Sequence, residues 1–403
     1  MAEEVGFEPT EGCPSHAFQA CRFGRSRTPP GLRSTRYPAG NLEPLALFPV
    51  SEVTVGSCAM DAREPGQTRN GAAFIGIVCV PQIAWPPPQS PGTGTVPAVQ
   101  VHLVDGTYEL FRQHFGSANR RRESDREAGP YDATIGVLTS TLQLIEDGAT
   151  HIGVASDHVI ESFRNELWAG YKTSEGMLPE LLHQIPIMED ALTAMGVTTW
   201  AMVEWEADDA LAAAAAVAER DERVEQVLIV TPDKDLGQCV VGKRVVQYDR
   251  RKREIIDEDG VREKFGVGPE SIPDYLGLVG DAADGFPGLP GWGAKSASLV
   301  LGRYGHLENI PAQASLWDVD GLRGAAKLSA TLRENMELAV LFRIVATVDR
   351  DVPVGTVDDW RWQGPTDRFP QVCEKLGVPA LATRTTRLHV ALTTAYGDTA
   401  YGG

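Results

Sequence analysis

The chain has 403 residues, and its 37 Lys and Arg against 55 Asp and Glu give a formal net charge of −18. This acidity argues against a general basic coat for nucleic acid or an anionic membrane, but it leaves room for a local basic groove. The length allows about two domains, and a hydrophobic content of 42% is enough for a real core. No apolar run approaches the roughly 18–20 residues that a membrane span requires.

Residues 1–100 differ in composition from the rest, because they hold 14 of the 27 prolines and 4 of the 6 cysteines but no Lys. Proline at this density blocks helices and strands, so we expect residues 1–98 to form an irregular or disordered extension. The opening segment 4–10 resembles the spurious translation of a transfer RNA gene, which predicts a true start near Met60 or just before Val101. A genuine flexible tail is the alternative, and N-terminal mass spectrometry of the native protein would separate the two.

The six cysteines lack the paired spacing of a zinc site or a disulfide framework. Residues 1–30 show no basic segment followed by an apolar stretch and a small-residue cleavage site. We therefore expect buried or incidental thiols in a reducing, cytoplasmic protein.

From Val101 onward, short β-rich runs alternate with helical patterns. The runs that predict strands are residues 101–104, 151–155, 197–203 and 226–230. A helical pattern follows the first run over residues 107–115, and an alanine-rich helix follows the third and runs to about Glu219. This alternation predicts an α/β fold with right-handed crossovers and a parallel sheet, whose site lies outside the carboxyl ends of the strands.

Acidic residues recur where these strands end. They are Asp105, Asp157, Glu206, Asp208, Asp209, Asp233 and Asp235. One Asp after a strand is usually a turn former or a helix N-cap, but four acidic strand ends at one edge repel each other unless a cation neutralises them. Hard oxygen ligands without His or Cys favour Mg²⁺ or Mn²⁺ over zinc, and the surplus of carboxylates suggests two ions. Asp208 and Asp209 are adjacent at a helix start, so we expect one to bind metal directly and the other through water.

A second unit begins after residue 255. Its segment 280–285 carries Asp281 and Asp284, three residues apart and therefore on one helical face or turn. A glycine-rich hairpin over residues 286–297 then opens a helix, where Gly291 and Gly293 permit close backbone approach and Lys295 adds a cation. An ordinary turn between helices is the alternative for this loop, but beside the two acids it indicates sequence-independent binding of a phosphate backbone.

Six motifs occur in the order seen in bacterial 5′-3′ exonucleases. They are Val104-Asp-Gly106, Ser162-Phe-Arg164 with Gly170-Tyr-Lys172, Glu206-Ala-Asp-Asp209, Thr231 to Leu236, Gly280-Asp-x-x-Asp284, and Gly288-x-x-Gly-x-Gly293. The chain resembles the 5′-nuclease domain that precedes family A DNA polymerases, within the flap endonuclease superfamily. This resemblance implies a PIN-like domain over residues 99–255 with a helical arch, and a helix-three-turn-helix DNA-binding domain over residues 256–353. Residues 354–403 are left as a C-terminal extension, in which two Trp residues suggest a small packed unit rather than a polymerase.

The resemblance also implies roles for individual residues. It makes Asp105, Asp157, Glu206, Asp208, Asp209 and Asp233 ligands of a first metal or its water shell, and Asp235, Asp281 and Asp284 ligands of a second. It implies arch cations that position the phosphate, Arg164 and Lys172, and further DNA contacts at Tyr171, Gly288, Gly291, Gly293, Lys295 and Ser296. The expected cofactors are two Mg²⁺ ions with Mn²⁺ as a substitute, and a K⁺ ion at the hairpin is a further hypothesis. The expected partner is DNA with 5′ flaps, nicks, gaps or single-stranded 5′ ends, with no membrane and no protein partner evident.

The sequence departs from the family pattern at several positions. Thr173 to Gly176 lack the basic residue usual after the Tyr-Lys pair, Gly285 stands where Asn is common, and Ser156 replaces an aromatic residue before Asp157. The run Arg120 to Arg122 is interpreted as an exposed charged loop. The leading hypothesis is a Mg²⁺-dependent 5′-3′ exonuclease and flap endonuclease of replication or repair. The alternatives are a DNA-structure-binding protein without turnover and a PIN-type ribonuclease.

Overall fold

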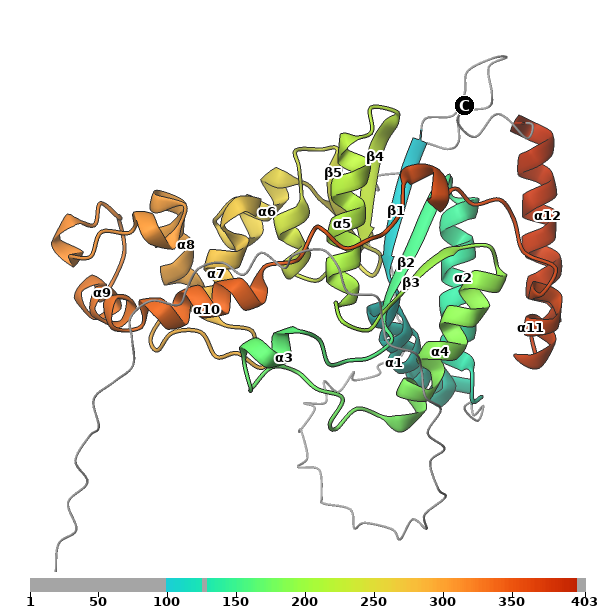
Figure 1. Ribbon diagram of the computed structural model, residues 1–403, viewed down its shortest axis with the longest axis horizontal. Helices are drawn as coiled ribbons and strands as arrows, with labels where there is room; N and C mark the ends of the chain where they lie inside the picture. The colour runs from blue at the N-terminus through green and yellow to red at the C-terminus, as the bar shows by residue number, and fades with distance from the viewer. Residues whose placement is uncertain (1–98, 125–128, 397–403) are drawn as a thin grey trace, which may run out of the picture. The chain divides into compact units, whose positions relative to one another are not determined.

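A computed structural model describes residues 99–124 and 129–396 (Figure 1). The expectations for residues 1–98 therefore lie outside the described residues. No helix in the described part is long and apolar enough to cross a membrane.

A six-stranded sheet with the order β3-β2-β1-β4-β5-β6 forms the centre of the N-terminal half. The strands are β1 (Val99–Asp105), β2 (His151–Asp157), β3 (Thr198–Met202), β4 (Val224–Val230), β5 (Val245–Asp249) and β6 (Glu254–Ile256). Neighbouring strands from β3 to β5 pair in parallel, and β6 pairs antiparallel with β5. The four predicted strands are confirmed, whereas β5 and β6 were not predicted.

Two layers of hydrophobic side chains cover the two faces of this sheet. Along β1, Leu103 points into one core and Val104 into the other, as the two-residue period of a strand requires. One face is covered by α1 (Gly106–Ser124), α2 (Asp132–Glu146) and α4 (Pro179–Ala194), and the other by α5 (Ala207–Arg220). The alanine-rich sequence of α5 keeps its side chains small, so the helix lies close to the sheet. The run Arg120 to Arg122 belongs to α1 rather than to a loop, which corrects that expectation.

The second half is helical and has its own core. Its helices are α6 (Glu258–Phe265), α7 (Ile272–Val279), α8 (Ala294–Tyr304), α9 (Ala325–Glu334) and α10 (Met336–Ala346). Short 3-10 turns join the elements of this half, namely η2 (Pro269–Ser271), η3 (Leu307–Asn309) and η4 (Ala314–Leu316), and a further 3-10 turn, η1 (Asp235–Cys239), lies between β4 and β5. Helix α7 packs against α8 and α10 (Figure 1). Phe286 and Phe342 are buried in the core of this half, with ring centroids 5.5 Å apart. Apolar burial therefore sets the position of the turn that follows α7, which carries Asp281 and Asp284.

The C-terminal segment packs against the sheet domain instead of forming a core of its own. Trp360, in turn η5 (Val357–Trp360), is fully buried and meets Trp200 edge to face with ring centroids 5.5 Å apart. Helices α11 (Phe369–Lys375) and α12 (Pro379–Tyr396) follow, and α12 lies beside α2 (Figure 1). Arg384 of α12 pairs with Glu146 of α2, which ties the end of the described chain to the outer face of the fold.

Candidate metal centre and nucleic-acid cleft

Three parallel strands bring their acidic ends to one edge of the sheet. Asp105 ends β1, Asp157 ends β2, and Asp233 follows β4 by three residues. Because β1 lies between β2 and β4, in register with both, these three positions are neighbours across the sheet. The sequence prediction that the strand ends converge is thus reproduced by the topology.

Asp105 is buried in the middle of this edge. One of its oxygens accepts a hydrogen bond from the backbone of Tyr108 at 2.8 Å, and the other accepts one from the Thr231 hydroxyl at 3.0 Å. Burial raises the pKa of Asp105 to about 7, and the neighbouring carboxylates of Asp157 and Asp233 add to the rise. A nearby divalent cation would favour the ionised form of such a carboxylate.

Asp157 and Asp208 share the same electrostatic environment. Oδ1 of Asp157 accepts a hydrogen bond from the backbone of Ala207 at 2.8 Å, which ties the end of β2 to the start of α5. Burial raises the pKa of Asp157, and it raises that of Asp208 well above its ordinary value, with Asp233 and Asp105 contributing to the latter. Each of the two acids interacts electrostatically with Asp105 at the carboxyl edge of the sheet.

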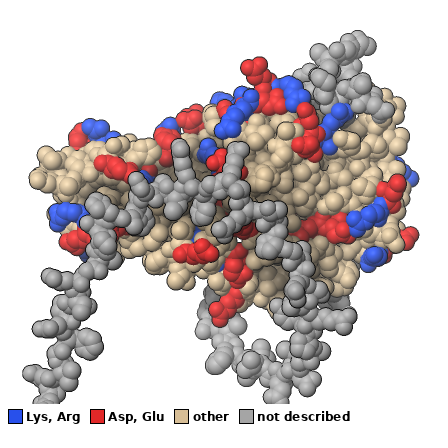
Figure 2. All heavy atoms as spheres, viewed as in Figure 1, with Lys and Arg blue, Asp and Glu red and all other residues tan. Residues whose placement is uncertain are grey.

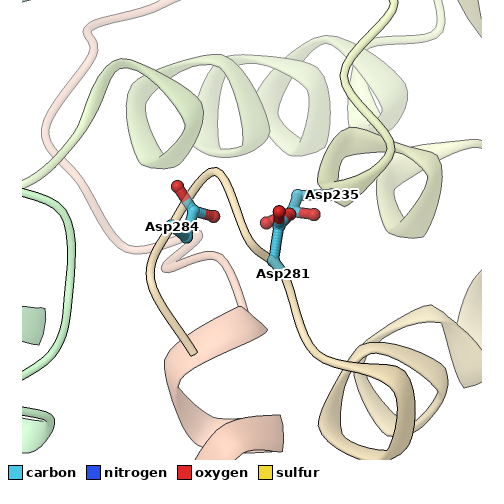
Figure 3. A group of neighbouring side chains, drawn as sticks. All are labelled: Asp235, Asp281 and Asp284. Atoms are coloured by element: carbon cyan, nitrogen blue, oxygen red, sulfur yellow. The ribbon is translucent and has the colours of Figure 1, made fainter. Parts of the chain in front are cut away.

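A second group of acids joins the two halves of the fold. Asp235, Asp281 and Asp284 each offer an oxygen, and these oxygens all lie within 4.8 Å of one another (Figure 3). Asp235 is buried, and its Oδ1 has no hydrogen-bond partner among the described residues. Burial raises the pKa of Asp235, and Asp233 and Asp284 add to the rise. We call these three residues the acidic trio; they are the set that the family resemblance assigns to a second metal.

The turn that carries Asp281 and Asp284 is held by its backbone. Asp281 and Phe286 exchange two hydrogen bonds, of 2.8 and 3.0 Å, across the turn. Gly285 has φ +80°, and a Cβ there would lie 2.1 Å from the carbonyl oxygen of Gly170. Glycine at 285, where Asn is common in the family, is therefore required by this close contact between two chain segments.

Two lysines stand against the acids. Lys172 Nζ lies 2.8 Å from Glu206 and 3.2 Å from Asp284, so it bridges α5 and the acidic trio. Burial alone would lower the pKa of Lys172, but these carboxylates hold that pKa well above its ordinary value. Lys234 forms an ion pair with Asp281. The sequence interpretation missed Lys234, although its place between Asp233 and Asp235 was a signal that could have found it.

Arg164 does not lie on an exposed arch in this structure. The segment between β2 and α4 contains one short helix, α3 (Arg164–Leu167), and Arg164 is only 3% exposed. Its guanidinium donates to Asp209 at 2.7 Å twice, to Glu206 at 3.1 Å, and to the carbonyl oxygens of Val345 and Thr347 at 2.8 and 3.0 Å. All five N–H groups are thus used within the protein, which leaves none for a phosphate.

Asp209 and Tyr171 also lie away from the positions that their expected roles require. Asp209 is fully buried, and besides Arg164 its oxygens accept hydrogen bonds from the backbones of Glu206 and Asp349. Because these contacts occupy both oxygens, the structure places Asp209 in an ion pair and a helix cap rather than among metal ligands. Tyr171 is 5% exposed in the helical core, and its hydroxyl donates to Glu206 at 3.1 Å.

A cleft of about 780 Å³ opens beside the glycine-rich hairpin. One wall carries Gly291, Gly293, Lys295 and Ser296, all predicted from the sequence. The facing wall, which the sequence interpretation missed, carries Gly321, Arg323, Gly324 and Lys327 at the start of α9. Two helix N-termini and three cations therefore line one cleft, an arrangement suited to the phosphates of a nucleic-acid backbone.

Gly288 has a different role from the other hairpin glycines. Its φ is +66°, and a Cβ there would lie 2.4 Å from the backbone nitrogen of Gly280. Gly288 allows the hairpin to pack on the end of α7, and it does not line the cleft. On the face drawn in Figure 2, the described surface carries basic and acidic side chains in small groups of both signs.

Comparisons with known proteins agree over the described core. A family model described as "5'-3' exonuclease, N-terminal resolvase-like domain" matches residues 100–266, and one described as "5'-3' exonuclease, C-terminal SAM fold" matches residues 267–368. The DNA polymerase I of Bacillus caldotenax is 36% identical over 271 residues, which is 65% of this chain and 29% of that protein. The 5'-3' exonuclease of Buchnera aphidicola is 28% identical over 255 residues, which is 63% of this chain and 88% of that protein.

Solved structures give a more distant likeness. A T5 5'-exonuclease structure with bound zinc is 19% identical, covers 72% of this chain and 98% of its own, and has a TM-score of 0.49. The chain spans less than a third of the DNA polymerase I relatives and most of the shorter Buchnera protein.

Proposed function

The chain belongs to the 5′-3′ exonuclease family, with a PIN-like α/β domain followed by a helical domain, and from that premise we propose its reaction. It hydrolyses DNA phosphodiester bonds at 5′ ends and 5′ flaps with two divalent ions, Mg²⁺ or Mn²⁺, in replication or repair. The observation that carries the proposal is the acidic trio, with oxygens within 4.8 Å of one another and a buried Asp235 oxygen that has no partner among the described residues.

The ligands of the acidic trio fit a hard divalent cation. All three are carboxylates, which suits Mg²⁺ or Mn²⁺ better than zinc. A cation there would also satisfy the unpartnered oxygen of Asp235, whose burial without one is costly. When bound, two such ions supply an activated water and neutralise the charge on the leaving oxygen. Asp105, Asp157, Asp208 and Asp233 are the side chains proposed to hold the other ion.

The protein's own residues organise this centre. Glu206 accepts hydrogen bonds from Ser162 at 2.6 Å and Tyr171 at 3.1 Å, and it pairs with Lys172. Burial alone would raise the pKa of Glu206, but Lys172 and Arg164 hold that pKa below its ordinary value, so Glu206 stays ionised. Glu206 thereby fixes the Lys172 ammonium beside the acidic trio, where it can meet a phosphate oxygen. We assign Lys172 to phosphate binding, and Glu206 and Arg164 to positioning.

The cleft beside the hairpin supports duplex binding at a distance from the chemistry. Lys295, Arg323 and Lys327 present positive charge, and backbone N–H groups at the starts of α8 and α9 add donors. Contacts of this kind fix the position of a duplex without selecting its sequence. We propose that the cleft holds the duplex next to the cleaved end, and a K⁺ ion at the hairpin remains a hypothesis.

The decisive experiment measures cleavage of a 5′-labelled flap duplex with Mg²⁺, compared with EDTA. Asp235→Asn keeps the shape of the side chain but removes its negative charge, so we expect a rate loss of at least about a hundredfold, or roughly 2.7 kcal/mol. The matched control is Asp318→Asn, because Asp318 is 81% exposed and pairs only weakly with Arg303. Wild-type protein that binds the flap without cleaving it would indicate a DNA-structure-binding protein, and full activity of Asp235→Asn would refute the site.

A further inference from the structure

Lys234 is a cation inside the proposed metal centre. It caps turn η1 between Asp233 and Asp235, and its ammonium pairs with Oδ2 of Asp281. The Lys234 side chain is 34% exposed, whereas that of Asp281 is 6% exposed, so solvent reaches the lysine more easily than its partner. The carboxylates of Asp235 and Asp233 also act on the lysine electrostatically.

Both oxygens of Asp281 are already in use. Oδ1 accepts a hydrogen bond from the backbone of Ala283 at 2.9 Å, which holds the turn, and Oδ2 faces Lys234. Oδ1 can keep the turn bond and still offer a lone pair, but a divalent cation that binds Asp281 meets the Lys234 ammonium paired with Oδ2, and the two positive charges repel each other. The turn bond is local and keeps the backbone in shape, while a partly exposed lysine can swing into solvent at little cost.

We propose that Lys234 is the resident counter-ion of Asp281 within the acidic trio. It neutralises Asp281 while the trio lacks a divalent cation, and it leaves Asp281 when one binds. This role rests on the proposed function, because it requires the trio to be a divalent site. It has two consequences of opposite sign: Lys234 stabilises the ion-free fold by reducing repulsion among the acids, and it weakens divalent binding by competing for Asp281.

The test measures Mn²⁺ binding by electron paramagnetic resonance without DNA, and thermal unfolding in EDTA. Lys234→Gln keeps most of the side-chain length and can still donate to Asp281, but it removes the charge. We expect the variant to bind Mn²⁺ about tenfold more tightly at one site, equivalent to about 1.4 kcal/mol, and to unfold at a lower temperature in EDTA. Lys234→Arg should behave like the wild type. Lys252→Gln is the matched charge control, since Lys252 is 60% exposed and its nearest acids are Asp249 and Glu254.

The outcomes separate this role from the function on which it rests. In an Asp281→Asn background, Lys234→Gln should no longer change Mn²⁺ affinity, and a persisting change would overturn the counter-ion role. Equal or weaker binding by Lys234→Gln, with normal binding by the wild type, would overturn this role alone. A wild-type chain that binds no Mn²⁺ would overturn both proposals. If Lys234→Gln folds only with Mn²⁺ the role is supported, and if both it and Lys234→Met fail to fold in either condition, Lys234 is a packing residue and the role is wrong.

Discussion

Replacement of Arg164 by Met tests whether this arginine holds the fold together rather than binding DNA. Its side chain is 3% exposed, and its partner Asp209 is fully buried. Breaking a buried ion pair from one side leaves the other charge uncompensated, which costs about 3–5 kcal/mol. The carbonyl oxygens of Val345 and Thr347, at the end of α10, lose their donor as well. We therefore expect Arg164→Met to lower the free energy of unfolding by roughly 4 kcal/mol.

The assay is thermal unfolding followed by circular dichroism, supported by urea titration. For a fold of this size each kcal/mol shifts the midpoint by about 2–4 °C, so we expect a decrease of about 10 °C. The control is Arg223→Met, which also breaks pairs with two acids, Asp221 and Asp358, but at a site where the arginine is 45% exposed. An exposed pair of this kind contributes no more than about 1 kcal/mol.

Two results would contradict the reasoning. One is a stability loss for Arg164→Met no larger than that for Arg223→Met. The other is unchanged stability with a raised KM for flap DNA, which would restore the phosphate contact expected from the sequence. A double-mutant cycle with Asp209→Asn sharpens the measurement, because a buried pair should give a coupling energy above about 1.5 kcal/mol.

Three further predictions concern other parts of the fold. Trp168→Phe removes a 3.0 Å hydrogen bond to the carbonyl oxygen of Gly285, in the turn that carries Asp284, but keeps an aromatic ring against Phe342. Because this turn holds part of the acidic trio, Mn²⁺ affinity should fall by about fivefold, or ~1 kcal/mol, in a binding titration. Lys327→Ala should weaken duplex binding and reduce the slope of log K against log salt by about 0.9, and an unchanged slope would remove Lys327 from the interface. Burial lowers the pKa of His102 to about 4 from an ordinary 6.5, so the folded protein favours the neutral imidazole. The free energy of unfolding therefore has its full value above pH 6.5 and decreases by about 3 kcal/mol as the pH falls toward 4. His102→Leu should flatten this acid dependence in urea titrations at pH 4.5 and 7.

The sequence predicted the parts of the fold that local pattern determines. The four strands from β1 to β4 are apolar runs that end in Asp or lead to an acidic turn, and parallel pairing places those ends together. Strand β5 and the three-residue β6 were missed, because they are short and the chain between them is the charged run Arg250 to Arg253. Such a run has no strand periodicity. The strand β5 beside it is therefore determined by its pairing with β4 rather than by local propensity.

Contacts between distant segments could not be read from the pattern. Arg164 contacts Asp209, 45 positions away in the sequence, and the carbonyl oxygen of Val345, 181 positions away. The spacing of these residues does not predict either contact. The motif position of Arg164 favoured a phosphate contact, but burial decided between the two interpretations. The role of Gly288 also depends on a contact with another segment. Position 288 requires glycine because the backbone of Gly280 lies against it, rather than because a ligand binds there.

The acids of the site fall into two groups, those that pair with a Lys or Arg of the protein and those that do not. This difference bears on which acids a divalent cation needs. Asp209, Asp281 and Glu206 each face a Lys or Arg within ion-pair distance. In the described part of the chain no such pair involves Asp105, Asp157, Asp208 or Asp235, and burial raises the pKa of all four. Burial also raises the pKa of Asp284, which pairs with Lys172. Buried carboxylates without a counter-ion keep their charge only if a cation arrives from outside the chain. Asp209 and Glu206 are therefore satisfied within the protein, Asp105, Asp157, Asp208 and Asp235 are open to a cation from outside, and Asp281 becomes open when Lys234 leaves it.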